Sequence, residues 1–206
     1  MTNVLLLPAF SSQSAFAVVN NADWNDGILF CAPTSPTLPI MLVCSYTAGL
    51  PTVNCGATSQ LVTGMPIAIA PGIPGGAFVG SILDAANFTM VDLNGIPLNA
   101  TMTEAAAALT FNPIPLDITG ISFRAQVRAM AGGNDVYLDI STNDGTMING
   151  GSDGVLLFKV PALSMMKIDA GNYVMDILAF GDGNTMNLFP QGAAALTVND
   201  GITEVQ

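Results

Sequence analysis

Hydrophobic and polar residues alternate most regularly just after the middle of the chain. Residues 116–120 carry the Asp, Thr and Gly of a turn, and in residues 121–128 every second side chain is apolar. The intervening side chains include Arg124, Gln126 and Arg128. Because successive side chains of a strand point to opposite faces, this pattern predicts a strand with one apolar face and one basic face.

The same succession of short strands and Gly/Asn/Asp turns continues toward the end of the chain. A crossover with one helical turn is expected around residues 162–167. The other expected strands span residues 136–140, 146–148, 155–160, 171–180, 185–189 and 193–198. Short strands at even spacing are typical of an antiparallel sandwich. We therefore predict a mainly β protein in which residues 115–206 form a β-sandwich that folds on its own.

The N-terminal region, residues 1–33, predicts an arm followed by a hairpin. A proline and several serines disrupt any helical period in residues 1–14, which we expect to be extended. Residues 15–19 are expected to pair with the strand in residues 24–31 across an Asn/Asp-rich turn. This hairpin either stands apart or forms part of the C-terminal sandwich.

Residues 34–114 differ in composition and predict a separate β-rich region, an inserted or assembly subdomain. Short apolar runs between Gly, Pro and Asn indicate several short strands. Asn94-Gly95 suits the φ > 0 positions of a type I′ hairpin turn. The run Thr103–Leu109 contains four successive alanines and predicts a short helix.

Charge is scarce and acidic. Only 9% of the residues are charged, four basic against fifteen acidic, and the formal net charge is −11. Such a surface repels phosphate backbones and anionic lipids, so we expect no nucleic acid and no membrane partner. The apolar runs also fall short of the ~20 residues that a spanning helix needs. Because half of the residues are hydrophobic, a largely neutral exterior indicates contacts with neighbouring subunits.

The residue types of most catalytic sites are missing from the sequence. There is no histidine for a Ser-His or Cys-His dyad, and no phosphate-binding Gly-Lys-Ser/Thr motif. A carboxylate pair for glycoside hydrolysis would have to draw on aspartates or on the two glutamates, Glu104 and Glu204. We therefore expect no enzymatic activity, no small-molecule substrate and no cofactor.

Three Asp/Asn/Gly turns, at residues 143–145, 152–154 and 181–184, raise the alternative of bound calcium. None has the spacing of an EF-hand loop. Asp, Asn and Gly are also the usual residues of tight turns. Turn formation is the favoured interpretation, and calcium binding stays open.

The three cysteines are Cys31, Cys44 and Cys55. Their number is odd and no histidine is available to complete a zinc site. Buried free thiols are the favoured interpretation, because free Cys behaves as a small hydrophobe. One disulfide among the three is the alternative.

Four residues are candidate subunit-interface contacts. Arg124 and Arg128 either pair with acidic residues of the next strand, such as Asp139, or contact an acidic neighbouring subunit. Met165 and Met166 lie in the crossover, where flexible side chains either fill the core or pack at an interface.

Leu116-Asp-Ile-Thr-Gly120 and Ala125-Gln-Val-Arg128 give a turn followed by an arginine-containing strand. In these motifs the second half of the chain resembles a small immunoglobulin-like module of tailed-bacteriophage structural proteins. Asp169-Ala-Gly-Asn-Tyr-Val-Met-Asp176 matches a later strand, and Gln191-Gly-Ala-Ala-Ala-Leu-Thr-Val198 matches the closing one. Ala22-Asp-Trp24 resembles the family's first hairpin, although here residues 34–114, 81 positions, lie between this hairpin region and the next motif.

The resemblance implies an Ig-like sandwich and a non-enzymatic structural role in a virion, made in the host cytoplasm. Its implied partners are other virion proteins and copies of itself. The tail, neck or baseplate is the first expected location. A capsid decoration or cement protein is the runner-up, and a carbohydrate-binding or host-adhesin module is the third alternative.

Overall fold

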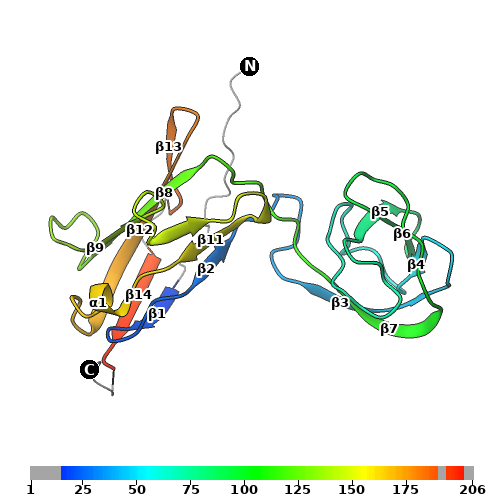
Figure 1. Cartoon of the computed structure of the whole chain (residues 1–206), viewed down its shortest axis with the longest axis horizontal. Helices are drawn as coiled ribbons and strands as arrows, with labels where there is room; N and C mark the ends of the chain where they lie inside the picture. The colour runs from blue at the N-terminus through cyan, green and yellow to red at the C-terminus, as the bar shows by residue number, and fades with distance from the viewer. Residues whose placement is uncertain (1–14, 190–193, 202–206) are drawn as a thin grey trace. The chain divides into compact units, whose positions relative to one another are not determined.

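The computed structural model describes residues 15–189 and 194–201. The chain divides into two compact units (Figure 1). Unit 1 is formed by the N-terminal segment up to Phe30 together with the chain from Pro115 onward, and unit 2 is Cys31–Ile114. These boundaries lie close to those expected from the sequence, 33/34 and 114/115. The arm expected over residues 1–14 lies outside the described residues.

Unit 1 contains two sheets. The larger has the order β1-β14-β12-β8-β9, with β13 paired to β12, and the smaller has the order β10-β11-β2. All neighbouring strands are antiparallel except β1 and β14, which are parallel. The strands are β1 (Ala15–Val19), β2 (Gly27–Leu29), β8 (Ser122–Arg128), β9 (Val136–Ser141), β10 (Met147–Asn149), β11 (Val155–Phe158), β12 (Gly171–Gly181), β13 (Asn184–Asn187) and β14 (Ala194–Asn199). The predicted mainly β, antiparallel architecture is confirmed.

The alternation in β8 gives the expected two faces. Phe123, Ala125 and Val127 are buried in a core to which both sheets of unit 1 contribute. The chain's one tryptophan, Trp24, stacks there on Phe158 of β11, with ring centroids 4.6 Å apart. Burial of aliphatic and aromatic side chains between the sheets is the main stabilising term for such a unit.

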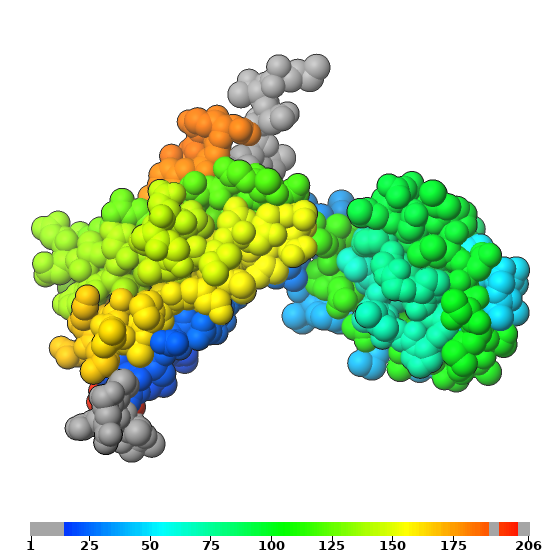
Figure 2. Space-filling view, viewed as in Figure 1, coloured from blue at the N-terminus to red at the C-terminus, as the bar shows by residue number. Residues whose placement is uncertain are grey.

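The hairpin expected between residues 15–19 and 24–31 is wrong. β1 pairs with β14, placing Val18 beside Val198, whereas β2 pairs with β11 of the other sheet. Figure 2 shows the blue N-terminal segment lying directly against the yellow segment that contains β11. The chain crosses between the sheets at the expected turn, because both sheets have an edge that a strand can extend. The N-terminal strands therefore belong to the C-terminal sandwich, which residues 115–206 alone do not complete.

Unit 2 is built on one five-stranded antiparallel sheet of order β5-β6-β4-β3-β7. Its strands are β3 (Ile40–Tyr46), β4 (Thr52–Asn54), β5 (Phe78–Ile82), β6 (Asn87–Val91) and β7 (Glu104–Phe111). A separate core forms on one side of this sheet, with Val53, Phe88 and Phe111 fully buried.

The helix expected over Thr103–Leu109 is wrong, because these residues lie in β7. Leu109 and Phe111 alternate into the core, and β7 pairs with β3 from Ile40 to Tyr46. Alanine favours a helix by less than 1 kcal/mol per residue over most other residues. Ladder hydrogen bonds and the burial of two large side chains outweigh that preference.

The turn at Asn94-Gly95 is in the expected place but has a different type. Gly95 has φ +79°, whereas Asn94 does not adopt a positive φ. The Gly95 N–H donates to the Asp92 carbonyl (3.0 Å), and the Asp92 carboxylate accepts from the N–H groups of Asn94 and Ile96. The aspartate thus stabilises a turn that needs only one left-handed residue, so type I′ is wrong here.

Among the described residues, no helix has the length and apolar character needed to span a bilayer. The crossover of unit 1 contains the expected helical turn, α1 (Ala162–Met165).

Candidate interaction surfaces

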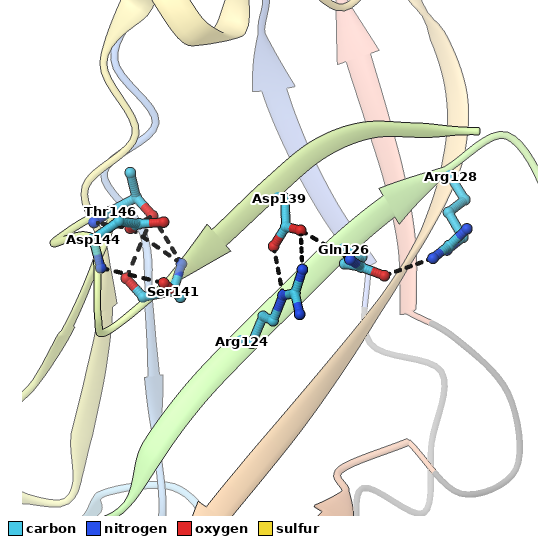
Figure 3. A network of polar contacts seen from close by, with 7 residues as sticks. All are labelled: Arg124, Gln126, Arg128, Asp139, Ser141, Asp144 and Thr146. Atoms are coloured by element: carbon cyan, nitrogen blue, oxygen red, sulfur yellow. Dashed lines mark hydrogen bonds and ion pairs between the residues drawn. The ribbon is translucent and has the colours of Figure 1, made fainter. Parts of the chain in front are cut away.

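The outer face of β8 and β9 in unit 1 carries a chain of polar contacts (Figure 3). Arg124 forms an ion pair with Asp139, and its Nε donates to Asp139 Oδ1 at 2.8 Å. Gln126 Nε2 donates to the other oxygen of Asp139 at 2.9 Å, and Arg128 donates to Gln126 Oε1 at 2.6 Å and to the Gly133 carbonyl. The register places Gln126 directly opposite Asp139, so these contacts follow from strand pairing.

The electrostatics of this network are those of a local ion pair. The hydrogen bond from Arg124 is the main cause that holds the pKa of Asp139 below its usual range, and the same bond raises the pKa of Arg124.

The expected pairing with Asp139 is confirmed for Arg124. Arg128 instead binds Gln126 and the turn after β8. Contact of either arginine with another subunit stays a prediction.

The two methionines of the crossover separate into one core residue and one surface residue. Met165 is fully buried in the core of unit 1, so its assignment as an interface residue is wrong. A side chain on a four-residue helix reaches the core once per turn, and here Met165 occupies that position. Met166 is 51% exposed, next to exposed Leu163, and is still available for contact.

The turn at residues 143–145 uses the side chain of Asp144 to form the turn itself. Asp144 Oδ1 accepts hydrogen bonds from the N–H groups of Ser141 and Thr146 and from the Thr146 hydroxyl (Figure 3). Burial opposes ionisation of Asp144, but these bonds outweigh it and lower the pKa. Gly145, Gly154 and Gly183 have positive φ, as tight turns require. Within the described ranges, no three Asp, Glu, Cys or His side chains gather as metal ligands.

The aromatic side chains that could mark a sugar-binding face fall into two groups. Trp24 and Tyr46 are buried, each in the core of its own unit. Tyr137 of β9 and Tyr173 of β12 lie together, with ring centroids 5.2 Å apart in an edge-to-face arrangement. Tyr137 is partly exposed, so this pair places an aromatic edge at the surface of unit 1.

The surface that sequence reasoning missed is the outer face of β3 and β7 in unit 2. It consists of Met41 and Val43 on β3 and Ala106 and Ala108 on β7, all of them exposed, and is called the β3–β7 face below. The exposed fractions of Met41 and Val43 are 71% and 68%. Val43 lies directly opposite Ala108 and Met41 opposite Thr110, so the side chains along this face are uncharged and mostly apolar.

The edge of the same sheet adjoins this face. β7 is the last strand of the sheet, and residues 66–68 cover only its C-terminal end through hydrogen bonds with Thr110 and Asn112. Unit 2 contains three acidic residues, Asp84, Asp92 and Glu104, and no lysine or arginine. Charged residues and prolines are the usual protection of an exposed edge, and Ala105–Ala108 supply neither. The sequence signal for this surface is the segment Ile40–Val43, in which every residue is apolar. A strand with apolar side chains on both faces leaves one apolar face outside its own core.

Comparison with known proteins gave no match to any protein-family model or to any curated protein.

Proposed function

We propose that this chain is a non-enzymatic structural component of a bacteriophage virion that acts through protein–protein contacts. The tail, neck or baseplate is its first expected place, and a capsid decoration or cement role is the alternative. Its partners are other virion proteins and copies of itself. The proposal rests on the motif resemblance, on the strand order of unit 1 and on the exposed surface of unit 2.

The strand order of unit 1 supports the Ig-like part of the proposal. In immunoglobulin domains one sheet contains strands G, F and C, extended by C′ in the variable type, and the other contains B, E and D. The orders β14-β12-β8-β9 and β2-β11-β10 correspond to these two sheets strand by strand, in the same chain order. Unit 2 then lies in the connection between strands B and C.

A tyrosine at the start of β12 supports the same assignment. The Tyr173 hydroxyl donates to the carbonyl of Asp169, four residues upstream, at 2.8 Å. A tyrosine near the start of strand F that bonds back to the chain before it is a recurrent feature of Ig-like sandwiches. β12 occupies the position of strand F.

The observation that carries the assembly role is the β3–β7 face. Exposed contiguous apolar surface beside an open strand edge is typical of a protein–protein contact. We propose a second copy of this chain as its occupant. The face itself has no charge, so two copies of an acidic protein meet there without repulsion between close charges.

The exposed ring of Tyr137, which packs against the partly buried Tyr173, favours the carbohydrate-binding alternative. Aromatic rings with an accessible apolar surface are typical of sugar contacts. This alternative predicts glycan binding that the change Tyr137→Ala abolishes, whereas the structural proposal predicts no glycan binding by either protein.

Self-association tests the proposed contact through the β3–β7 face. The change Val43→Lys places a charge at the centre of the face, where an interface would have to bury it. We expect sedimentation velocity of the full chain to show a dissociation constant at least about tenfold weaker than that of the unchanged protein.

The matched control is Leu93→Lys, which adds the same charge at an exposed apolar residue in the turn before Asn94 of unit 2. It is expected to leave self-association unchanged. A full-length protein that stays monomeric at high concentration, or equal weakening by both changes, would contradict an interface at the β3–β7 face.

A further inference from the structure

Two of the three cysteines face each other across a strand pair in unit 2. In the ladder between β3 and β4, Ser45 lies opposite Asn54 and Tyr46 lies opposite Val53. The next position along β3 is Cys44, and the next position beyond β4 is Cys55. The antiparallel register therefore places these two cysteines directly opposite each other.

The two thiols are also buried together. Cys44 and Cys55 are 1% and 5% exposed and belong to the same hydrophobic core. Both cysteines are free, and each thiol lies within hydrogen-bonding distance of backbone carbonyls: Cys44 of Leu42, and Cys55 of Ala57 and Ala86. Opposite residues in antiparallel strands have Cα atoms about 4.5–5.5 Å apart, within the roughly 4.4–6.8 Å that a disulfide spans.

The two cysteines differ in how readily they ionise. Burial and, to a smaller extent, the neighbouring Cys55 together raise the pKa of Cys44 to about 12. Burial also raises the pKa of Cys55, but hydrogen bonds from Cys44 and from the backbone at Ala57 oppose that rise. Cys55 is also the more exposed of the two thiols, at 5% against 1%, so we expect it to meet a reagent first and to react as the thiolate.

We propose that Cys44 and Cys55 are a redox modification site, a latent cross-strand disulfide that forms by exchange with a low-molecular-weight disulfide such as oxidised glutathione. The Cys55 thiolate attacks one sulfur of the reagent, forming a mixed disulfide and releasing one glutathione thiol. The Cys44 sulfur then attacks the Cys55 sulfur, forming the internal bond and releasing the second. The protein loses two hydrogen atoms, and the reagent is reduced by two electrons to two thiols.

The bond would reinforce the shortest ladder of the sheet. β3 and β4 share two paired positions, fewer than any other neighbouring strands of unit 2. Closing the short loop between Cys44 and Cys55 restricts the unfolded chain, which is the main way in which a disulfide stabilises a protein. The bond requires only an oxidising environment, so it does not depend on a role in a virion.

The test uses the full chain with Cys31→Ser, which leaves the two opposed cysteines as its only thiols. After incubation with oxidised glutathione, we expect both thiols to resist alkylation under denaturing conditions. The intact mass should fall by two hydrogen atoms, with no glutathione adduct. Calorimetry should show a transition of unit 2 raised by about 5–10 °C and restored by a reductant.

Two double variants and a refolding experiment test whether the bond forms between Cys44 and Cys55. With Cys31→Ser plus Cys44→Ala, the reagent should remain as an adduct on Cys55, and with Cys31→Ser plus Cys55→Ala no internal bond can form. Refolding from denaturant in a glutathione buffer removes the barrier that burial places on reagent access. Two alkylatable thiols after such refolding, or adducts on both cysteines, would overturn the proposal.

Discussion

At the scale of single residues, strand pairing sets both the polar network on β8 and β9 and the opposition of Cys44 and Cys55 in unit 2. The pairing of Arg124 with Asp139 follows from two adjacent strands with opposite charges on one face. The burial of Met165 depends on how one short helical turn meets the core, and no periodic pattern in the sequence reports that. The sequence also did not show that Cys44 and Cys55 face each other, because this follows only from the register of β3 and β4.

The change Asp139→Asn tests the network on β8 and β9. The variant loses the charge that holds Arg124, and because that pair is exposed we expect the melting temperature to fall by no more than a few degrees at pH 7. The same change at Asp135, an exposed residue outside the network, is the control and should have less effect.

The pH dependence of this difference has a definite sign. The pKa of Asp139 is lowered in the folded state, so its contribution is present above the pKa of the unfolded chain. It is lost as the pH falls through the folded-state pKa. The melting temperatures of the unchanged protein and of Asp139→Asn should therefore converge in acid, and a difference that grows toward low pH would contradict the network.

At the scale of strands and turns, regular alternation located the elements of unit 1 but not their partners. The expected strands at 136–140, 155–160 and 171–180 all overlap observed ones. The pairing of β1 and β2 was wrong because adjacent strands need not form a hairpin when each can extend a different sheet. The four alanines of β7 led to the wrong prediction of a helix, because the helix preference of alanine is small compared with the free energy of pairing β7 with β3.

Gly80 lies at an irregularity in the register of β5 and β6 and allows the two strands to approach. A Cβ there would lie 2.7 Å from Val91 Cγ1 and 2.9 Å from the Thr89 carbonyl oxygen. We expect Gly80→Ala to destabilise unit 2 by about 1–3 kcal/mol in urea unfolding, because the backbone must shift.

The control for Gly80→Ala is Gly75→Ala. A Cβ at Gly75 meets no atom within 4 Å, and its φ is not left-handed. This change should leave the free energy of unfolding within about 0.5 kcal/mol of the original value. Equal effects of the two changes would show that close approach of β5 and β6 does not restrict position 80.

At the scale of the whole molecule, the composition shift at the start of residues 34–114 marked a true insertion. Unit 2 begins and ends at neighbouring points, since the Ala32 N–H donates to the Ile114 carbonyl at 2.9 Å. In unit 1, the Leu116 N–H donates to the Phe30 carbonyl at 2.8 Å. Segments whose ends lie together can be inserted into a fold without disturbing it. The sequence could not show that β1 and β2 complete the sandwich, because that pairing is long-range.

Excision of unit 2 tests this organisation. A chain in which a short Gly-Ser linker replaces residues 31–114 should fold, and Trp24 should keep the fluorescence of a buried indole.

The fragment 115–206 lacks β1, β2 and the core residues Trp24 and Phe30, so it should fail to unfold cooperatively. This expectation replaces the one drawn from sequence. A stable 115–206 fragment would contradict the role of the N-terminal strands.

The central claim, a structural role in a virion, is tested most directly by counting the chain in purified particles. Quantitative mass spectrometry of particles from the organism that encodes it would give the number of copies relative to the major capsid protein. The account predicts a fixed copy number: three, six or twelve would indicate a tail, neck or baseplate protein, and hundreds would indicate capsid decoration. Absence of the chain from purified particles, with its presence in the producing cells, would contradict the claim.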